Sequence, residues 1–178
     1  MSIVGVSGKA NVGKDTFADF LHAFPPWFVK KSFAFKLKQI AQILTGWGDQ
    51  YTREGKAHYL PEWGMTVGTF QQKLGTDAVR FGLKDDAWIL ALFADYTPNQ
   101  FWCIQDVRFA NEAESIRERD GVLVRINRDI EDDCGRDKNH ISETALDNWH
   151  DWDFVIDNNG SLEHLESEAL RVLREIQW

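Results

Sequence analysis

Nine residues, Gly8–Thr16, constrain the fold of this chain more than any other stretch, because they set two glycines five positions apart with a lysine directly after the second. An apolar run, Ser2–Ser7, precedes them and is typical of a buried parallel strand. Between residues 17 and 24, apolar side chains recur with helical spacing. Glycines let consecutive backbone N–H groups curl around an anion, and the positive end of the helix dipole lies behind it. The sequence therefore predicts a strand, a phosphate-binding loop and a helix, in that order.

Backbone amides of this loop would hold the phosphates of a nucleotide, and the Lys14 ammonium would reach the β- and γ-phosphates. The residues expected to bind them are Gly8, Asn11, Val12, Gly13, Lys14, Asp15 and Thr16. Asp15 stands where such loops usually carry serine or threonine as a ligand of Mg²⁺. Three interpretations stay open: Thr16 supplies the hydroxyl one position later, Asp15 acts on the metal or the substrate, or Asp15 caps the helix.

Length, charge and cysteine content exclude several classes of protein. A chain of 178 residues fits one domain, 1–178, with a sizeable core. Its apolar runs are far shorter than the roughly 20 residues that cross a bilayer. A net charge of −8 offers no broad basic face to a nucleic acid. Cys103 and Cys134 lack metal-ligand spacing and no signal-like segment precedes Ile3, so we expect a cytoplasmic protein. We expect it to bind small molecules and to bind neither nucleic acid nor a membrane. A homodimer stays open.

Strands and helices alternate along the rest of the chain. Further strands are expected at residues 27–33, 101–105, 122–126 and 154–156. Further helices are expected at residues 35–44, 66–80, 86–96, 110–119 and 162–176. Residues 46–65 are predicted to be a functional or mobile loop, and residues 127–140 a polar one. Alternation of this kind predicts a three-layer α/β fold with a central sheet of about five parallel strands and helices on both faces.

Five short runs of residues follow one another along the chain in an order that is informative. They are Gly8–Thr16, Gln72–Asp77 with Arg80 and Trp88, Asp106–Glu112, His140–Glu143 and Asp157–Gly160. In this order they resemble the phage-type deoxynucleoside monophosphate kinases of the P-loop kinase superfamily, over most of the chain. The resemblance implies transfer of the γ-phosphoryl group of ATP to a deoxynucleoside 5′-monophosphate with Mg²⁺, in the host cytoplasm if a phage encodes the chain. It also implies an acceptor-binding helical region at about 46–97 and a small lid at about 127–143.

The implied acceptor site combines polar residues from two parts of the chain. Its residues would be Gln72, Thr76, Arg80, Trp88, Asp106 and Arg108. Because Gln72, Thr76 and Arg80 repeat every four residues, they would share one helix face and present an amide and a guanidinium to the acceptor. An ordinary polar helix face is the alternative.

Asp106 and Arg108 follow the end of a predicted strand, which is where open α/β sheets bind ligands. Asp106 would order Mg²⁺ or its waters, and Arg108 would clamp a substrate phosphate. The alternatives are a helix cap for Asp106 and a surface ion pair for Arg108.

The polar loop before His140 is similar to the lid of that family. Arg128 and Arg136 would bring positive charge to the transferring phosphoryl group while the lid excludes water. The acidic residues of this loop are also consistent with a solvated surface segment. His140, Ser142 and Glu143 stand too close together for a hydrolase triad, and Ser142 is better explained as the cap of a short helix.

Asn158, Asn159 and Gly160 follow the last predicted strand, where the resemblance places the loop that holds the ATP adenine. Asn and Gly favour a tight turn with or without a ligand, so both interpretations hold together. The catalytic residues expected for the whole reaction are Lys14, Asp15, Arg108, Arg128 and Arg136. The residues expected to manage the metal are Asp15, Thr16 and Asp106.

Two other classes of protein share part of this pattern. Small P-loop kinases that act on dephospho-coenzyme A or phosphomevalonate share the loop, the lid and the terminal turn. Only the Gln72–Arg80 and Asp106–Arg108 runs favour a nucleotide acceptor over those substrates. A nucleotide-binding switch of the GTPase kind would carry an Asn-Lys-x-Asp guanine motif, which the sequence lacks.

Overall fold

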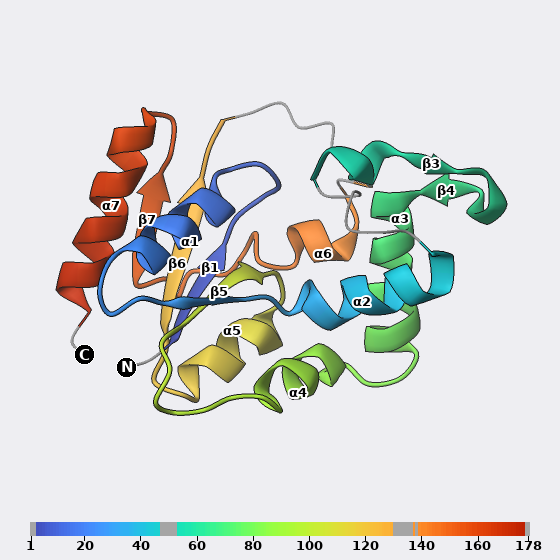
Figure 1. The fold of residues 1–178 in the computed structure, drawn as a ribbon, viewed down its shortest axis with the longest axis horizontal. Coiled ribbons are helices and arrows are strands. Elements are labelled where there is room, and N and C mark those ends of the chain that lie inside the picture. Colours follow the sequence, from blue (N-terminus) through green and yellow to red (C-terminus); the bar gives the residue numbers. More distant parts are fainter. Residues whose placement is uncertain (1–2, 47–52, 130–136, 138, 177–178) are drawn as a thin grey trace.

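The computed structural model describes residues 3–46, 53–129, 137 and 139–176. Its central sheet has five strands in the order β2-β5-β1-β6-β7, and all neighbouring strands are parallel (Figure 1). The strands are β1 (Ile3–Ser7), β2 (Val29–Lys31), β5 (Trp102–Val107), β6 (Val122–Asn127) and β7 (Phe154–Asp157). The predicted five-stranded parallel sheet is confirmed, and the strand that leads into the phosphate loop lies at its centre.

Helices cover both faces of this sheet, which confirms the three-layer arrangement. One face carries α1 (Lys14–Ala23) and α7 (Leu162–Glu175), and the other carries α4 (Ala87–Phe93) and α5 (Ala110–Arg117) (Figure 1). Successive side chains of a strand point to opposite faces. Val4 and Val6 accordingly pack in the cluster under α1 and α7, while Ile3 packs in the cluster under α4 and α5. Both faces of β1 are thus buried, which is why its sequence is an unbroken apolar run.

A second group of helices stands beside the sheet and forms what we call the side wall. It consists of α2 (Ala34–Thr45), α3 (Val67–Gln72) and a π-helix (Lys73–Phe81). The side wall has a small apolar cluster of its own, made of Ala41, Leu60, Val67 and Phe70. A short antiparallel hairpin, β3 (Tyr59–Leu60) with β4 (Met65–Thr66), leads into α3.

The structure differs from the sequence prediction in three places. In the loop predicted at 46–65, residues 53–65 form two 3₁₀ turns (Arg53–Ala57 and Pro61–Trp63) and most of the hairpin, whose last residue is Thr66, while residues 47–52 lie outside the described part. The predicted helix over 66–80 is α-helical only as far as Gln72. The strand predicted at 27–33 is shorter, because Trp27 has a φ of 55°, a left-handed value that a β-strand does not accommodate.

The short helix α6 (Ile141–Thr144) follows the predicted lid. Its N-cap is His140, whose Nδ1 accepts a hydrogen bond from the Ser142 N–H, so the expectation that Ser142 is the cap was wrong. Residues 130–136 and 138, including the lid residue Arg136, lie outside the described part. In the part of the chain that is described, no helix has the length and apolar character needed to span a membrane.

Candidate active site

Gly8 and Gly13, the two glycines of the phosphate loop, have backbone conformations that other residues rarely adopt. Gly8 has a φ of 153° and Gly13 a φ of 100°. A Cβ atom on Gly13 would lie 2.5 Å from Nδ2 of Asn158, and one on Gly8 would collide with the backbone oxygen of Ile126. The loop therefore needs glycine at both positions for its conformation as well as for close approach to a ligand.

Lys14 is the first residue of α1 and is buried. Its ammonium donates a hydrogen bond to the backbone oxygen of Lys9, so it lies across the loop that it closes. Gly13 is the N-cap of α1, and no side chain in the described residues caps the helix there. The positive end of α1 and the Lys14 ammonium therefore meet at the same place, which is the arrangement an anionic phosphate requires.

The turn after β7 holds the phosphate loop by a hydrogen bond to the loop backbone. Asn158 is only 4% exposed, and its Nδ2 donates to the backbone oxygen of Val12 over 2.8 Å. Its own N–H donates to the backbone oxygen of Asn127. The neighbouring Asn159 is exposed, and its Oδ1 accepts from the N–H of Asp129 at the base of the predicted lid. The Asn158 side chain is thus committed to the loop backbone, a contact the sequence did not reveal.

Replacing Asn158 by alanine is expected to lower the free energy of unfolding by about 1–3 kcal/mol, because the buried carbonyl of Val12 loses its donor. The KM for ATP is expected to rise, because the loop loses its support. Urea unfolding and initial-rate kinetics measure the two effects. Asn148→Ala, an exposed site after α6, is the control and should change neither. Wild-type stability in the Asn158 variant would contradict this role.

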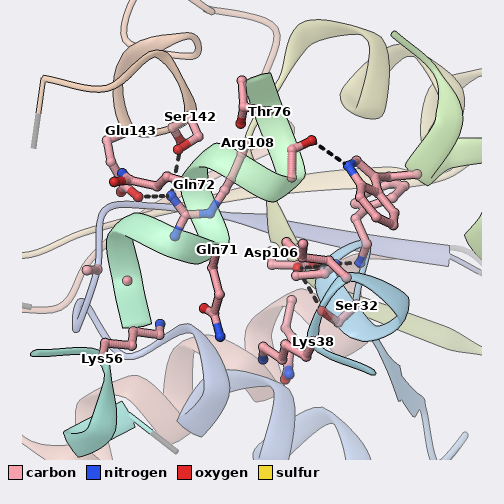
Figure 2. Close-up of a pocket in the computed structure, with 18 of the residues that line it drawn as sticks. Ser32, Lys38, Lys56, Gln71, Gln72, Thr76, Asp106, Arg108, Ser142 and Glu143 are labelled. Atoms are coloured by element: carbon pink, nitrogen blue, oxygen red, sulfur yellow. Dashed lines mark hydrogen bonds and ion pairs between the residues drawn. The ribbon is translucent and has the colours of Figure 1, made fainter. Parts of the chain in front are cut away.

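A cavity of about 480 Å³ joins the phosphate loop to the side wall (Figure 2). Asn11, Gly13, Lys14 and Asp15 line it on the loop side. Although acidic residues outnumber basic ones in the chain as a whole, the cavity collects five cations against four carboxylates. The cations are Lys14, Lys38, Lys56, Arg80 and Arg108, and the carboxylates are Asp15, Asp106, Glu112 and Glu143. The cavity therefore carries a small excess of positive charge in a chain whose net charge is negative, which favours a phosphorylated ligand there.

Gln72, Thr76 and Arg80 line the cavity from the side wall, and all three side chains are buried. Gln72 makes a paired contact with the backbone of Asp137. Its Nε2 donates to the Asp137 oxygen over 3.0 Å, and its Oε1 accepts from the Asp137 N–H over 3.1 Å. In this structure the amide therefore docks the end of the predicted lid onto the side wall.

Trp88 of α4 lines the same cavity and contacts the π-helix. Trp88 is 7% exposed and donates from Nε1 to the backbone oxygen of Gly75 over 2.8 Å. Leu37 of α2 packs so closely that a Cβ atom on Gly75 would lie 2.8 Å from its Cδ2. π-helical turns are rare and are found frequently at functional sites. Helical spacing in the sequence does not distinguish such a turn from an ordinary α-helix.

Arg80 forms the back of the cavity and is paired within the protein. Its Nη2 lies 2.5 Å from Oε1 of Glu112, and its Nη1 donates to Oδ1 of Asp85 and of Asn111. Its guanidinium also lies over the ring of Phe109, 3.9 Å from the centroid. With only 2% of the residue exposed, Arg80 is placed to support the site rather than to hold a ligand by itself.

Glu112 ends the run Asp106–Glu112, and no function was predicted for it. The structure shows that its carboxylate holds Arg80 and the backbone at the start of α5. Besides Arg80, its carboxylate accepts hydrogen bonds from the N–H groups of Arg108 and Phe109. Burial raises the pKa of Glu112 to about 7, although the charge of Arg80 and these two hydrogen bonds act in the opposite direction. A Glu three residues after a helix N-cap is the sequence signal that would have revealed it.

Asp106 and Arg108 both lie at the cavity, as predicted from their position at the end of a strand. Asp106 accepts hydrogen bonds from Oγ of Ser32 (2.7 Å) and from the N–H groups of Phe33 (2.8 Å) and Ala34 (3.0 Å), so it anchors the start of α2. Figure 2 shows this contact across the cavity from Arg108.

Arg108 contacts the segment that contains α6. Its Nη1 lies 2.6 Å from Oε1 of Glu143 and donates to the backbone oxygen of Ser142 over 3.0 Å. Burial lowers the pKa of the Arg108 guanidinium, but Glu143 and the nearby Asp106 and Glu112 more than offset it, so the pKa is raised. Arg108 therefore remains fully charged at the edge of the cavity.

The other predicted residues are placed less centrally. Thr16 lies in α1 and Arg128 is exposed at the base of the predicted lid; neither lines the cavity, and the same is true of Asn159 and Gly160. Sequence reasoning missed several polar cavity residues besides Glu112 and Glu143. Among them are Ser32, Lys38, Lys56 and Gln71, which Figure 2 labels.

A lysine-bearing phosphate loop at the carboxyl end of a central parallel strand, opening on a cavity that extends to a helical wall, is the architecture of the P-loop phosphotransferases that act on small molecules. The sequence profile of the family described as deoxynucleotide monophosphate kinase matches residues 50–169. That match covers more than half of the chain, including α3 and the π-helix of the side wall, Arg108 and α6. The chain belongs to the deoxynucleotide monophosphate kinase family.

Named relatives agree with this assignment. A protein of Acanthamoeba polyphaga mimivirus, named as a deoxynucleotide monophosphate kinase, is 30% identical over 188 residues that cover 96% of this chain and 95% of that protein. The deoxynucleotide monophosphate kinase of Escherichia phage RB69 is 31% identical over 115 residues, which cover 61% of this chain and 45% of that protein. Among solved structures, a dephospho-CoA kinase from Campylobacter jejuni is 17% identical, with a TM-score of 0.48 over 98% of this chain and 96% of that one.

Proposed function

We propose that this chain transfers the γ-phosphoryl group of ATP to the phosphate of a deoxynucleoside 5′-monophosphate. The observation that carries the proposal is the single cavity of about 480 Å³ that opens on both the phosphate loop and the side wall. Phosphoryl transfer depends mainly on holding donor and acceptor in line and on stabilising charge. The family match over residues 50–169, which include α3 and the π-helix of the side wall, supports a nucleotide as the acceptor.

The donor phosphates would lie on the loop Gly8–Thr16, with the Lys14 ammonium on the β- and γ-phosphates. The ammonium already lies across this loop, at the positive end of α1. Since the Asn158 side chain is turned toward Val12, contacts to the adenine would come from Asn159, Gly160 and the backbone of the turn.

Mg²⁺ fits the oxygen groups near the loop. Asp15 lines the cavity, and the Thr16 hydroxyl follows one residue later in α1. Mg²⁺ commonly takes one or two protein oxygens and completes its octahedron with phosphates and waters, so Asp15 and Thr16 would hold it. Both Asp106 oxygens already accept hydrogen bonds at the start of α2, so Asp106 would reach the metal through water. When bound, the metal would neutralise charge on the transferring phosphoryl group.

The acceptor phosphate would be held by Arg108, while Gln72, Thr76 and Trp88 shape the pocket for the nucleoside and Arg80 supports it from behind. The attacking phosphate oxygen is anionic at neutral pH, so the reaction requires no strong general base. The lid residues Arg128 and Arg136 would add positive charge when the lid covers the cavity.

A coupled ADP-release assay with Mg-ATP tests this proposal against a panel of acceptors. The panel contains dGMP, dTMP, dCMP, dAMP, their ribose counterparts, dephospho-coenzyme A and phosphomevalonate. We expect turnover with at least one deoxynucleotide, because the cavity offers a guanidinium for its phosphate and amide, hydroxyl and indole groups for its nucleoside. The preferred acceptor identifies the base.

Other outcomes have definite meanings. Turnover only with dephospho-coenzyme A or phosphomevalonate would keep the kinase and replace the substrate. No ADP release with any acceptor of the panel, while ATP still binds, would contradict the proposal and favour a nucleotide-binding switch.

A further inference from the structure

The segment His140–Asp147, which contains α6, contacts both the phosphate loop and Arg108. We call it the bridge. On the loop side, Lys9 donates from Nζ to the backbone oxygen of Glu143 and pairs with the Asp147 carboxylate. On the other side, the Glu143 side chain pairs with Arg108. Leu146 fixes the bridge to the core beside α4 and α5, where it is 4% exposed. Donor loop and acceptor arginine are therefore attached to the same four-residue helix.

The contact between Arg108 and the bridge uses only one edge of the guanidinium. Nη1 takes both partners, the Glu143 carboxylate at 2.6 Å and the Ser142 carbonyl at 3.0 Å (Figure 2). In the described part of the chain, Nε and Nη2 of Arg108 make no hydrogen bond. Arg108 lines the cavity with 23% of its side chain exposed, whereas the Glu143 side chain is only 7% exposed.

We propose that Glu143 is a positioning residue, which holds Arg108 by Nη1 so that the Nε and Nη2 edge is presented to the acceptor phosphate. The inference rests on the proposed function and adds a specific residue to it. A guanidinium binds phosphate best through two parallel N–H groups, and this requires a fixed orientation. A long arginine side chain loses much rotamer freedom on binding, so a partner that fixes it beforehand lowers that cost.

The alternative is that Glu143 competes with the acceptor phosphate for Arg108. Two observations favour positioning. Glu143 occupies one nitrogen and leaves a two-nitrogen edge for a ligand. Lys9 also holds the backbone oxygen of Glu143, so the backbone from which its side chain extends is tied to the phosphate loop. The two hypotheses predict opposite changes in acceptor affinity when the carboxylate is removed.

Glu143→Ala tests the proposal while keeping the contact with the phosphate loop, because Lys9 binds the backbone oxygen of Glu143. We expect the KM for the deoxynucleotide to rise about tenfold, with kcat and the KM for ATP changed less than about twofold. Glu143→Gln keeps an acceptor oxygen for Nη1 and is expected to restore part of the affinity. Glu114→Gln, an exposed position on α5, is the matched control.

A double-substitution cycle separates positioning from a general structural role. In an Arg108→Met background, Glu143→Ala is expected to change the acceptor KM by less than about twofold, because Glu143 acts through Arg108. The same tenfold rise in that background would overturn the proposal, as would an unchanged or lowered KM in the single variant. A lowered KM would identify Glu143 as a competitor.

Calorimetric binding of the deoxynucleotide to each variant keeps this test apart from that of the proposed function. Turnover by the wild type with additive effects in the cycle would leave the function standing and overturn the role of Glu143. Binding without turnover would overturn the function, and the cycle would then be scored on Kd with the same expectations. If the wild type neither binds nor converts any deoxynucleotide, both proposals fail.

Discussion

Replacing Lys14 by methionine is expected to lower kcat by about a hundredfold to a thousandfold, which is the usual cost of removing one fixed charge from a site of developing negative charge. Methionine keeps the unbranched stem of the buried Lys14 and removes only the ammonium. The hydrogen bond to the Lys9 carbonyl is lost, but the glycine conformations and the Asn158 support of the loop remain. The variant should therefore fold normally and fail in turnover.

Initial rates of ADP release with the best acceptor measure this effect, and circular dichroism with urea unfolding checks the fold. Lys73→Met is the matched control, because Lys73 is exposed on the π-helix and lies outside the cavity. It should retain wild-type kcat. A folded Lys14 variant with near-normal kcat would remove the phosphate loop from the reaction.

Replacing Glu112 by alanine is expected to lower the free energy of unfolding by about 3 kcal/mol, the lower part of the range for breaking a buried ion pair. Arg80 would lose its closest partner while keeping Asp85, and the N–H groups of Arg108 and Phe109 would lose their acceptor. Urea denaturation measures the loss. Glu114→Ala, on the exposed side of the same helix, is the control and should change stability little. A loss no greater than that of the control would contradict the supporting role of Glu112.

The raised pKa of Glu112 gives its contribution a definite pH dependence. The pKa is about 7 in the folded protein against 4.5 for an unperturbed glutamate, so the folded state binds more protons than the unfolded state between those values. The stability that this carboxyl contributes is present below pH 4.5 and is lost as pH rises to about 7. Relative to Glu112→Gln, which does not titrate, the wild type should lose stability between about pH 5 and pH 7.5. A difference that moves the other way with pH would contradict the shift.

Local patterns predicted the elements whose contacts are local or periodic. The apolar run of β1, the glycine spacing and the helical spacing of α1 lie next to one another, so the strand, the loop and Lys14 could be located from the sequence. The five-stranded parallel sheet followed from alternation. Asp106 and Arg108 were found because a strand end marks the binding edge of such a sheet.

Contacts between distant residues were beyond that reasoning. Asn158 meets Val12 across 146 positions, and nothing in either neighbourhood marks the pair. Arg80 pairs with Glu112 on a different helix, so its helical spacing suggested an acceptor contact where the structure shows a buried ion pair. The role of His140 as a cap depends on its backbone turn, which composition does not encode.

Ala41, Leu60, Val67 and Phe70 give the side wall a core apart from the two clusters that flank the sheet. Substitutions that reshape the side wall change the packing of this small cluster first. Their effects on the free energy of unfolding are expected to add to those of substitutions around β1. Over evolutionary time, such a division would let the lineage change the side wall without disturbing the phosphate loop. Divergence among relatives should then accumulate faster in α2, α3 and the π-helix than around the loop and its central strand.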